Sequence, residues 1–169
     1  MNEFEEMFKD TWFFEDVPLG YSTASPYGRT IREADIINYA GISGEYAPIY
    51  IDDEYAKQTK YGRVIAQDMM LFTFTTSIDT NNELTAKINK AILVSKGTKN
   101  WKIYGKAYVG DTIYTKSEIV DKIDNKPTRG VIVTQMSILN QKGEVLQSGE
   151  YHLIVAKKCY FEEQFAKQA

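Results

Sequence analysis

The second half of the chain alternates between apolar and polar residues with a period of two, which is the pattern of half-buried β-strands. Ile, Val, Tyr and Thr are concentrated in segments near residues 101–109, 112–123, 130–139 and 145–156. Turn-forming sequences separate these segments: Gly110-Asp111, Asp124-Asn125-Lys126-Pro127 and Asn140-Gln141-Lys142-Gly143. The pattern therefore predicts four consecutive antiparallel strands.

A long apolar stretch precedes the strands. The run from Ala66 to Ile78 is too long for a typical strand, and its Met and Leu content favours a helix. Because it is apolar on most sides, we expect its neighbours to cover it almost completely. Helices followed by a β-meander predict an α+β fold in which this helix packs against the sheet.

The connection at residues 43–52 lies between two further predicted helices. Thr30 and Glu33 have the spacing of a capping box, which predicts a helix from about Ile31 to Ile42. Pro48 moves the preceding residue away from helical backbone angles, and Asp52 can cap a second short helix. Residues 43–52 should therefore form an irregular, tightly turned segment.

The length and composition indicate one packed domain. The chain has 169 residues, of which 43% are hydrophobic and 25% are charged. We assign the domain to residues 21–156, with an N-terminal arm at residues 1–20 and a C-terminal tail at residues 157–169. The net charge of -3 and the pI of about 5.3 offer no broad basic face, so nucleic acid is not an expected partner.

The numbers of cysteine and histidine residues limit the metal sites and disulfides that the chain can form, and they bear on its cellular location. Cys159 is the single cysteine and cannot form an intrachain disulfide, and the acidic N-terminus does not resemble a secretory signal. We therefore expect a cytoplasmic protein without a membrane span. His152 is the single histidine, which excludes a multi-histidine metal site, and we expect no metal.

The connection at residues 43–52 has the sequence Ser43-Gly44-Glu45-Tyr46-Ala47-Pro48-Ile49-Tyr50-Ile51-Asp52. It resembles the hallmark of the MaoC-like family of hot dog hydratases and dehydratases, which is Ser-Gly-Asp-x-Asn-Pro-x-His-x-Asp. This family includes (R)-specific enoyl-CoA hydratases. Similar elements follow in the family order at residues 14–20, 61–66, 109–112 and 140–145. The likeness extends over roughly residues 13–156. It implies a hot dog fold, in which a curved antiparallel sheet wraps around a long central helix, here residues 66–78.

The resemblance also implies a function. Proteins of this family act in fatty acid metabolism, where they add water to the double bond of an enoyl thioester or form that double bond by removing water. Coenzyme A or an acyl carrier protein presents the substrate. No other cofactor is implied. The expected partners are the acyl thioester and a second hot dog subunit, either an identical one in a homodimer or larger homo-oligomer, or a related one in a heterodimer. Two alternatives stay open: a non-catalytic subunit that binds the acyl thioester, and an acyl-CoA thioesterase.

The candidate catalytic residues are Glu45, Tyr50 and Asp68, where the chain departs from the family pattern. Glu45 replaces the catalytic Asp and would act as a general base. Tyr50 replaces the catalytic His and would donate a proton or a hydrogen bond, or form a wall of the substrate tunnel. Asp68 replaces a Gly at the helix entrance, where it would activate water in a thioesterase or would only complement the helix dipole.

The resemblance places the thioester carbonyl at the start of the central helix. A backbone N–H near Gln67 and Asp68 would stabilise the negative charge that develops on the carbonyl oxygen. The residues expected to contact the substrate are Ala47, which replaces the family's Asn, together with Pro48, Ala66, Gln67 and Met69.

Overall fold

The computed structural model describes residues 3–79 and 82–166, and within them it forms a six-stranded antiparallel sheet. The body of the sheet has the order β4-β5-β6-β3, and two short strands pair with the other side of β4. The strands are β1 (Ser22–Ala24), β2 (Arg29–Thr30), β3 (Ile92–Ile103), β4 (Thr112–Ile123), β5 (Arg129–Leu139) and β6 (Val145–Ala156). The predicted α+β class and the antiparallel sheet are confirmed.

Strand β3 differs from the sequence-based expectation. It begins at Ile92, well before the predicted start at residue 101, and it ends at Ile103. It pairs with β6, so only β4, β5 and β6 form a continuous meander. Most residues of β3 are exposed because it is an edge strand, and the regular alternation of burial on which the prediction depends is therefore weak.

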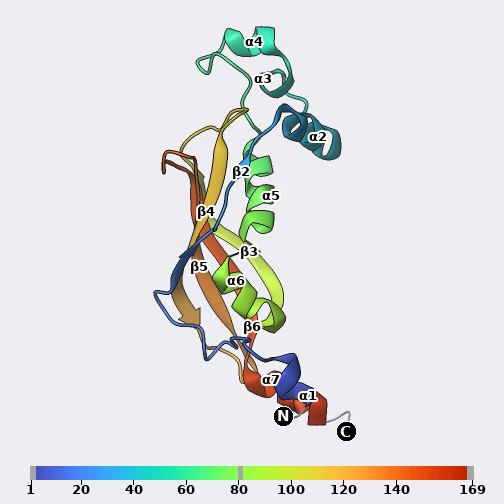
Figure 1. The fold of residues 1–169 in the computed structure, drawn as a ribbon, viewed down its shortest axis with the longest axis vertical. Helices are drawn as coiled ribbons and strands as arrows, with labels where there is room; N and C mark the ends of the chain where they lie inside the picture. Colours follow the sequence, from blue (N-terminus) through green and yellow to red (C-terminus); the bar gives the residue numbers. More distant parts are fainter. Residues whose placement is uncertain (1–2, 80–81, 167–169) are drawn as a thin grey trace.

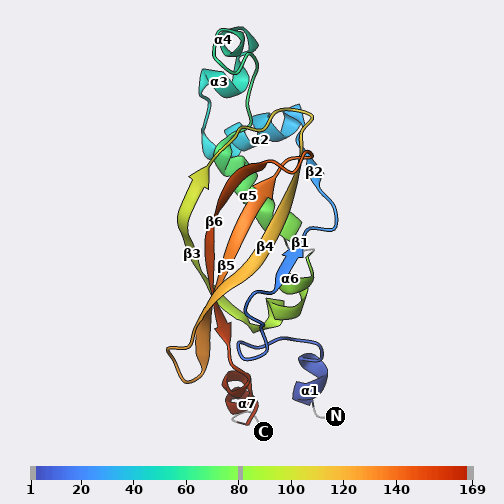
Figure 2. The ribbon, with the colours of Figure 1, turned by 90° about the vertical axis from the view of Figure 1, so that its left-hand side faces the viewer.

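Helix α5 (Asp68–Asp79) packs along one face of the sheet, close to the position predicted for the central helix (Figure 1, Figure 2). Its residues Met70, Leu71, Thr75 and Ile78 are buried. The opposite side of the helix is not covered: Met69 is 51% exposed. The expectation of almost complete burial is wrong for this side, because within the described chain the sheet covers a single face of α5.

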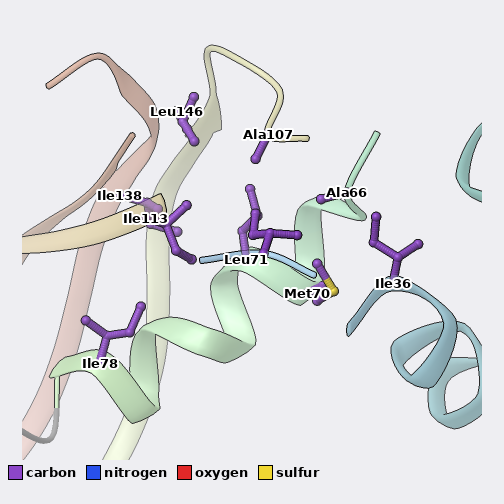
Figure 3. Close-up of a cluster of buried hydrophobic side chains, with 10 residues drawn as sticks. Ile36, Ala66, Met70, Leu71, Ile78, Ala107, Ile113, Ile138 and Leu146 are labelled. Carbon is purple, nitrogen blue, oxygen red and sulfur yellow. The ribbon is translucent and has the colours of Figure 1, made fainter. Parts of the chain in front are cut away.

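The contact between α5 and the sheet forms the main hydrophobic core. Figure 3 shows Leu71 among side chains that include Ile113 of β4 and Ile138 of β5, while Met70 lies toward Ile36. Ile36 is 2% exposed, and the other four side chains are fully buried. These contacts fix the position of the N-terminal turn of α5 relative to the sheet.

Three helices form one end of the molecule: α2 (Glu33–Ser43), α3 (Pro48–Ile51) and α4 (Asp53–Lys57) (Figure 1). The predicted capping box is wrong, because Thr30 belongs to β2 and its Oγ1 lies 2.8 Å from Oγ1 of Thr112. Helix α2 is capped two residues later, where Arg32 N–H donates to Asp35 Oδ2 at 2.8 Å. Asp52 caps α4 as predicted.

The remaining helices lie toward the other end, near the two termini (Figure 1). They are α1 (Glu3–Met7), α6 (Glu83–Ile88), the 3₁₀ turn η1 (Asn89–Ala91) and α7 (Lys158–Ala166). Phe13 and Phe14 are each 4% exposed and join a second core cluster with Ile119 and Ile132 of the sheet. Residues before the first strand thus contribute to the core.

Across residues 3–79 and 82–166, no helix is both long and apolar enough to cross a bilayer.

Replacing Leu71 with Ala tests the central packing. Because Leu71 is fully buried, we expect Leu71→Ala to lower the free energy of unfolding by about 2–5 kcal/mol in urea denaturation. Met69→Ala, on the exposed side of the same helix, is the matched control and should change it by about 0.5 kcal/mol or less. Equal effects of the two substitutions would contradict the packing described above.

Candidate active site

Glu45 and Tyr50 are positioned by the turn between α2 and α3. Gly44 ends α2 with a positive φ of 77°, a conformation that glycine adopts without strain. Glu45 follows directly, and its N–H donates to Ser43 Oγ at 3.2 Å. Pro48 begins α3, where its missing N–H has no cost, and Tyr50 lies in this short helix. The predicted irregular segment is therefore present, with one helical turn inside it.

Tyr50 lies close to both candidate carboxylates. Its pKa is raised to about 12, first by burial, and then by the negative charge and hydrogen bond of Glu45 and the charge of Asp68, with a smaller effect of Tyr61. The two turn residues Glu45 and Tyr50 thus share one electrostatic environment with Asp68, which comes from a later part of the chain. At neutral pH Tyr50 keeps its proton and donates a hydrogen bond toward Glu45.

Asp68 begins α5 and forms an ion pair that the sequence analysis did not identify. Its Oδ2 lies 2.5 Å from Lys106 Nζ, and the two side chains are 19% and 22% exposed. Its other oxygen, Oδ1, is buried and has no hydrogen-bond partner among the described residues. A buried carboxylate oxygen without a donor is unusual in a folded protein. Asp68 therefore has one oxygen held by a cation and one that can accept a further hydrogen bond.

No local sequence pattern could have identified Lys106. It follows the end of β3 in a segment where the N–H groups of Tyr104 and Gly105 both donate to the carbonyl of Leu146. The contact with Asp68 joins positions 38 residues apart in the chain. It results from the tertiary arrangement of α5 and the sheet, which spacing in the sequence does not reveal.

The first turn of α5 is anchored to the sheet by side-chain amides. Gln147 of β6 donates from Nε2 to the carbonyl of Asp68 at 2.9 Å, and Trp101 of β3 donates from Nε1 to Gln147 Oε1 at 3.0 Å. Gln67 is fully buried, and its Nε2 donates to the carbonyl of Ile36 at 3.0 Å. The Oε1 of Gln67 is also buried and has no partner among the described residues. The helix N-terminus is thus rigidly held.

The predicted substrate-binding residues occupy two different environments. Ala47, Pro48 and Met69 are exposed, whereas Ala66 and Gln67 are fully buried. Tyr50 borders a hollow of about 290 Å³, but neither Glu45 nor Asp68 belongs to its lining. The other lining residues are Glu33, Ile36, Ile37, Ile51, Asp53, Val64 and Val109. The three candidate catalytic residues are therefore neighbours but do not all border this hollow.

The groups present are suited to acid–base chemistry. The carboxylates can accept a proton from water, Tyr50 can donate a hydrogen bond, and the first turn of α5 leaves backbone N–H groups without intrahelical partners. Within the part of the chain that the structure describes, no group of three or more His, Cys, Asp or Glu residues is placed to hold a metal ion.

Comparisons with known proteins agree with this fold. The family model of the FAS1-like dehydratase domain region matches residues 19–148. The (R)-specific enoyl-CoA hydratase of Rhodospirillum rubrum is 26% identical over 145 residues, which cover 85% of this chain and 91% of that protein.

Solved structures show the same arrangement. A monoamine oxidase regulatory protein from Archaeoglobus has a TM-score of 0.80 and 26% identity, over 88% of this chain and 96% of that one. A MaoC-like dehydratase from Rhodospirillum rubrum has a TM-score of 0.77 and 22% identity, over 87% and 98% of the two chains. The fold also occurs in the HadBC complex of Mycobacterium tuberculosis, with a TM-score of 0.68 and 15% identity over 80% and 96% of the chains.

Alkaline titration tests the environment of Tyr50. Its pKa is about 12 in the folded protein and about 10 when unfolded. The neutral phenol therefore stabilises the fold fully below pH 10, and this contribution is lost as the pH rises toward 12. Tyrosinate absorbance should show a step near pH 12, and Tyr50→Phe should remove this step. Burial also raises the pKa of Tyr21, and the ionisation of Tyr21 should be unchanged in Tyr50→Phe. Glu45→Gln should shift the late step to lower pH.

The matched control is Glu33→Gln, which removes a carboxylate that borders the same hollow but does not contribute to the raised pKa of Tyr50. It should leave the late step unchanged. A step near pH 12 that survives in Tyr50→Phe would show that this step has been wrongly assigned to Tyr50.

The ion pair between Asp68 and Lys106 can be measured with a double-mutant cycle. Lys106→Met leaves the carboxylate of Asp68 partly buried without its cation, whereas the further change Asp68→Asn removes that charge. We expect urea denaturation to give a coupling energy of about 0.5–3 kcal/mol between the two sites. A coupling energy of zero would contradict the ion pair.

Proposed function

Because the chain belongs to the FAS1-like dehydratase region family of MaoC-like hot dog proteins, we propose that it is a hydratase or dehydratase that acts on an enoyl thioester. The observation that carries this proposal is the convergence of Glu45, Tyr50 and Asp68 at the N-terminus of α5. Glu45 and Tyr50 come from the segment that follows α2, Asp68 begins α5, and each of the three differs from the family pattern. Their convergence supports a working site of altered composition.

In the proposed hydration, Glu45 is the general base and Tyr50 is the proton donor. The oxygen of water forms a bond to the β-carbon of the double bond, and Glu45 takes the proton that water releases. The α-carbon then carries the electron pair and takes the phenolic proton of Tyr50. The proton held by Glu45 returns along its hydrogen bond to Tyr50. The sum is the addition of one water molecule, and dehydration follows the reverse path.

The raised pKa of Tyr50 suits this role. A phenol with a pKa of about 12 does not ionise at neutral pH, so it gives up its proton only to a strongly basic centre such as the α-carbon of a thioester enolate. The fixed N-terminus of α5 supports the same transition state, because its free N–H groups can stabilise charge on the thioester oxygen. The ammonium group of Lys106 offsets the charge of Asp68, one of the two carboxylates near Tyr50.

A thioesterase is the second candidate. It is favoured by the buried Oδ1 of Asp68, which has no donor among the described residues and could accept a hydrogen bond from an attacking water. In that reaction the oxygen of water adds to the thioester carbonyl carbon and Asp68 takes the proton of water. The C–S bond then breaks, the proton returns from Asp68 to the sulfur, and the free thiol and the carboxylic acid are released. In the third alternative, a subunit that only binds the acyl thioester, neither carboxylate would act on the ligand.

We also propose that the site is completed by a second hot dog subunit, either identical or related. The edge strand β3 supports this, because no strand of residues 3–79 and 82–166 pairs with its outer side, where a strand of another subunit could add to the sheet. Exposed apolar residues lie along it and just after it, including Val94, Ile103 and Tyr104. Coenzyme A or an acyl carrier protein would present the acyl group to the assembled site.

Assays with crotonyl-CoA and butyryl-CoA separate the three functions. We expect loss of the conjugated absorbance of crotonyl-CoA in the wild type, and a decrease in kcat of about 10²–10⁴-fold in Glu45→Gln. Glu54→Gln removes an exposed carboxylate paired with Lys57 and should retain wild-type activity. Thiol release from butyryl-CoA that Asp68→Asn abolishes would instead support the thioesterase. Binding of butyryl-CoA without either reaction would support the non-catalytic subunit and contradict the proposed enzyme.

A further inference from the structure

A second cavity lies between the helices and the inner face of the sheet, away from Glu45 and Tyr50. It has a volume of about 240 Å³ and is bordered by the helices α5 and α6 and by the strands β3, β5 and β6. Its apolar lining residues are Phe72, Leu84, Ile88, Ile92, Met136 and Leu153. A cavity of this size and character is suited to a hydrocarbon chain.

The cavity is aligned with the candidate active site along α5. Asp68, Phe72, Thr75 and Asp79 are spaced by four, three and four residues, so they lie on one face of the helix. The last three border the cavity. From Asp68 to Asp79 the helix rises by about 16 Å. A chain that starts at the N-terminus of α5 and follows this face would reach Asp79 with about 12 to 13 carbons, because an extended chain advances about 1.25 Å along its axis per bond.

Phe72 stands between the two ends of this path. Its ring makes an edge-to-face contact with Trp101, with 4.9 Å between the ring centres. Trp101 is in turn connected through Gln147 to the carbonyl of Asp68. The aromatic pair therefore joins the wall of the cavity to the first turn of α5.

The far end of the cavity contains a carboxylate, Asp79. Its Oδ1 accepts hydrogen bonds from Ser117 at 3.0 Å, from Thr115 at 3.4 Å and from Asn82. Among the described residues, its Oδ2 accepts a side-chain hydrogen bond only from Thr85 Oγ1, at 3.4 Å. Burial raises the pKa of Asp79 above its ordinary value, and the four donors offset only part of this effect. Oδ2 thus retains capacity for another donor.

We propose that this cavity receives the distal part of the acyl chain and that Asp79 makes it select chains with a hydroxyl group near their end. A plain alkyl chain would cover Oδ2 without offering a donor, which is unfavourable for a buried polar group. A hydroxyl would complete the hydrogen bonding of Oδ2 with a charge-assisted bond. Asp79 is then a specificity-determining residue. This inference rests on the proposed thioester substrate, and it extends that proposal to the chemical class of the acyl group.

Titration calorimetry with two thioesters tests the inference: dodecanoyl-CoA and 12-hydroxydodecanoyl-CoA. We expect the wild type to bind the hydroxylated thioester about tenfold more tightly. Asp79→Leu should reverse this preference. Asp79→Asn keeps the size of the side chain and removes its charge, so it should reduce the preference to about threefold or less even if Asp79→Leu does not fold. Asp121→Asn removes an exposed carboxylate of β4 and should leave the preference intact.

The outcomes separate this inference from the proposed function. Hydration of crotonyl-CoA, whose short chain does not extend to Asp79, reports the enzyme alone. Equal binding of the two twelve-carbon thioesters, or a preference that Asp79→Asn leaves unchanged, would overturn the role of Asp79 even if crotonyl-CoA is hydrated. Selective binding that depends on Asp79 would support it even if no hydration occurs. Absence of binding for both thioesters would overturn it together with the thioester substrate.

Discussion

The packing of α5 against the concave side of the sheet determines where every candidate functional group lies. Leu71 and Met70 are fully buried in this contact, and they hold the first turn of the helix over β4, β5 and β6. The side-chain amide of Gln147 then fixes the carbonyl of Asp68 from the sheet. Because interiors are close-packed, a shift of α5 would move both Asp68 and Asp79, at opposite ends of the helix. One apolar contact thus places two polar sites.

The candidate active site depends on charges that compensate one another. Two carboxylates, Glu45 and Asp68, lie near the neutral phenol of Tyr50, and Lys106 pairs with one of them. Without the lysine, the partly buried carboxylate of Asp68 would lose its cation. In this chain a phenol and an ammonium group surround the carboxylates where the family pattern has an imidazole.

The sequence was most informative where structure is local or strongly periodic. Strands β4 and β6 have the predicted bounds, and Asp52 caps its helix as expected. The capping box at Thr30 failed because the hydroxyl bonds to Thr112, more than 80 residues away. Strand β3 was misplaced because an exposed edge strand lacks regular alternation. Lys106 and Asp79 acquire their partners only through tertiary contacts, which neither motif nor spacing encodes.

The central claim is that the N-terminus of α5, Glu45 and Tyr50 together hold the reacting end of an acyl thioester. A crystal structure with bound butyryl-CoA tests it most directly, because this saturated ligand cannot be hydrated. The account predicts the thioester oxygen within hydrogen-bonding distance of a first-turn N–H of α5, and the α- and β-carbons beside Tyr50 and Glu45. An acyl group bound elsewhere, with Glu45 and Tyr50 facing solvent, would contradict it.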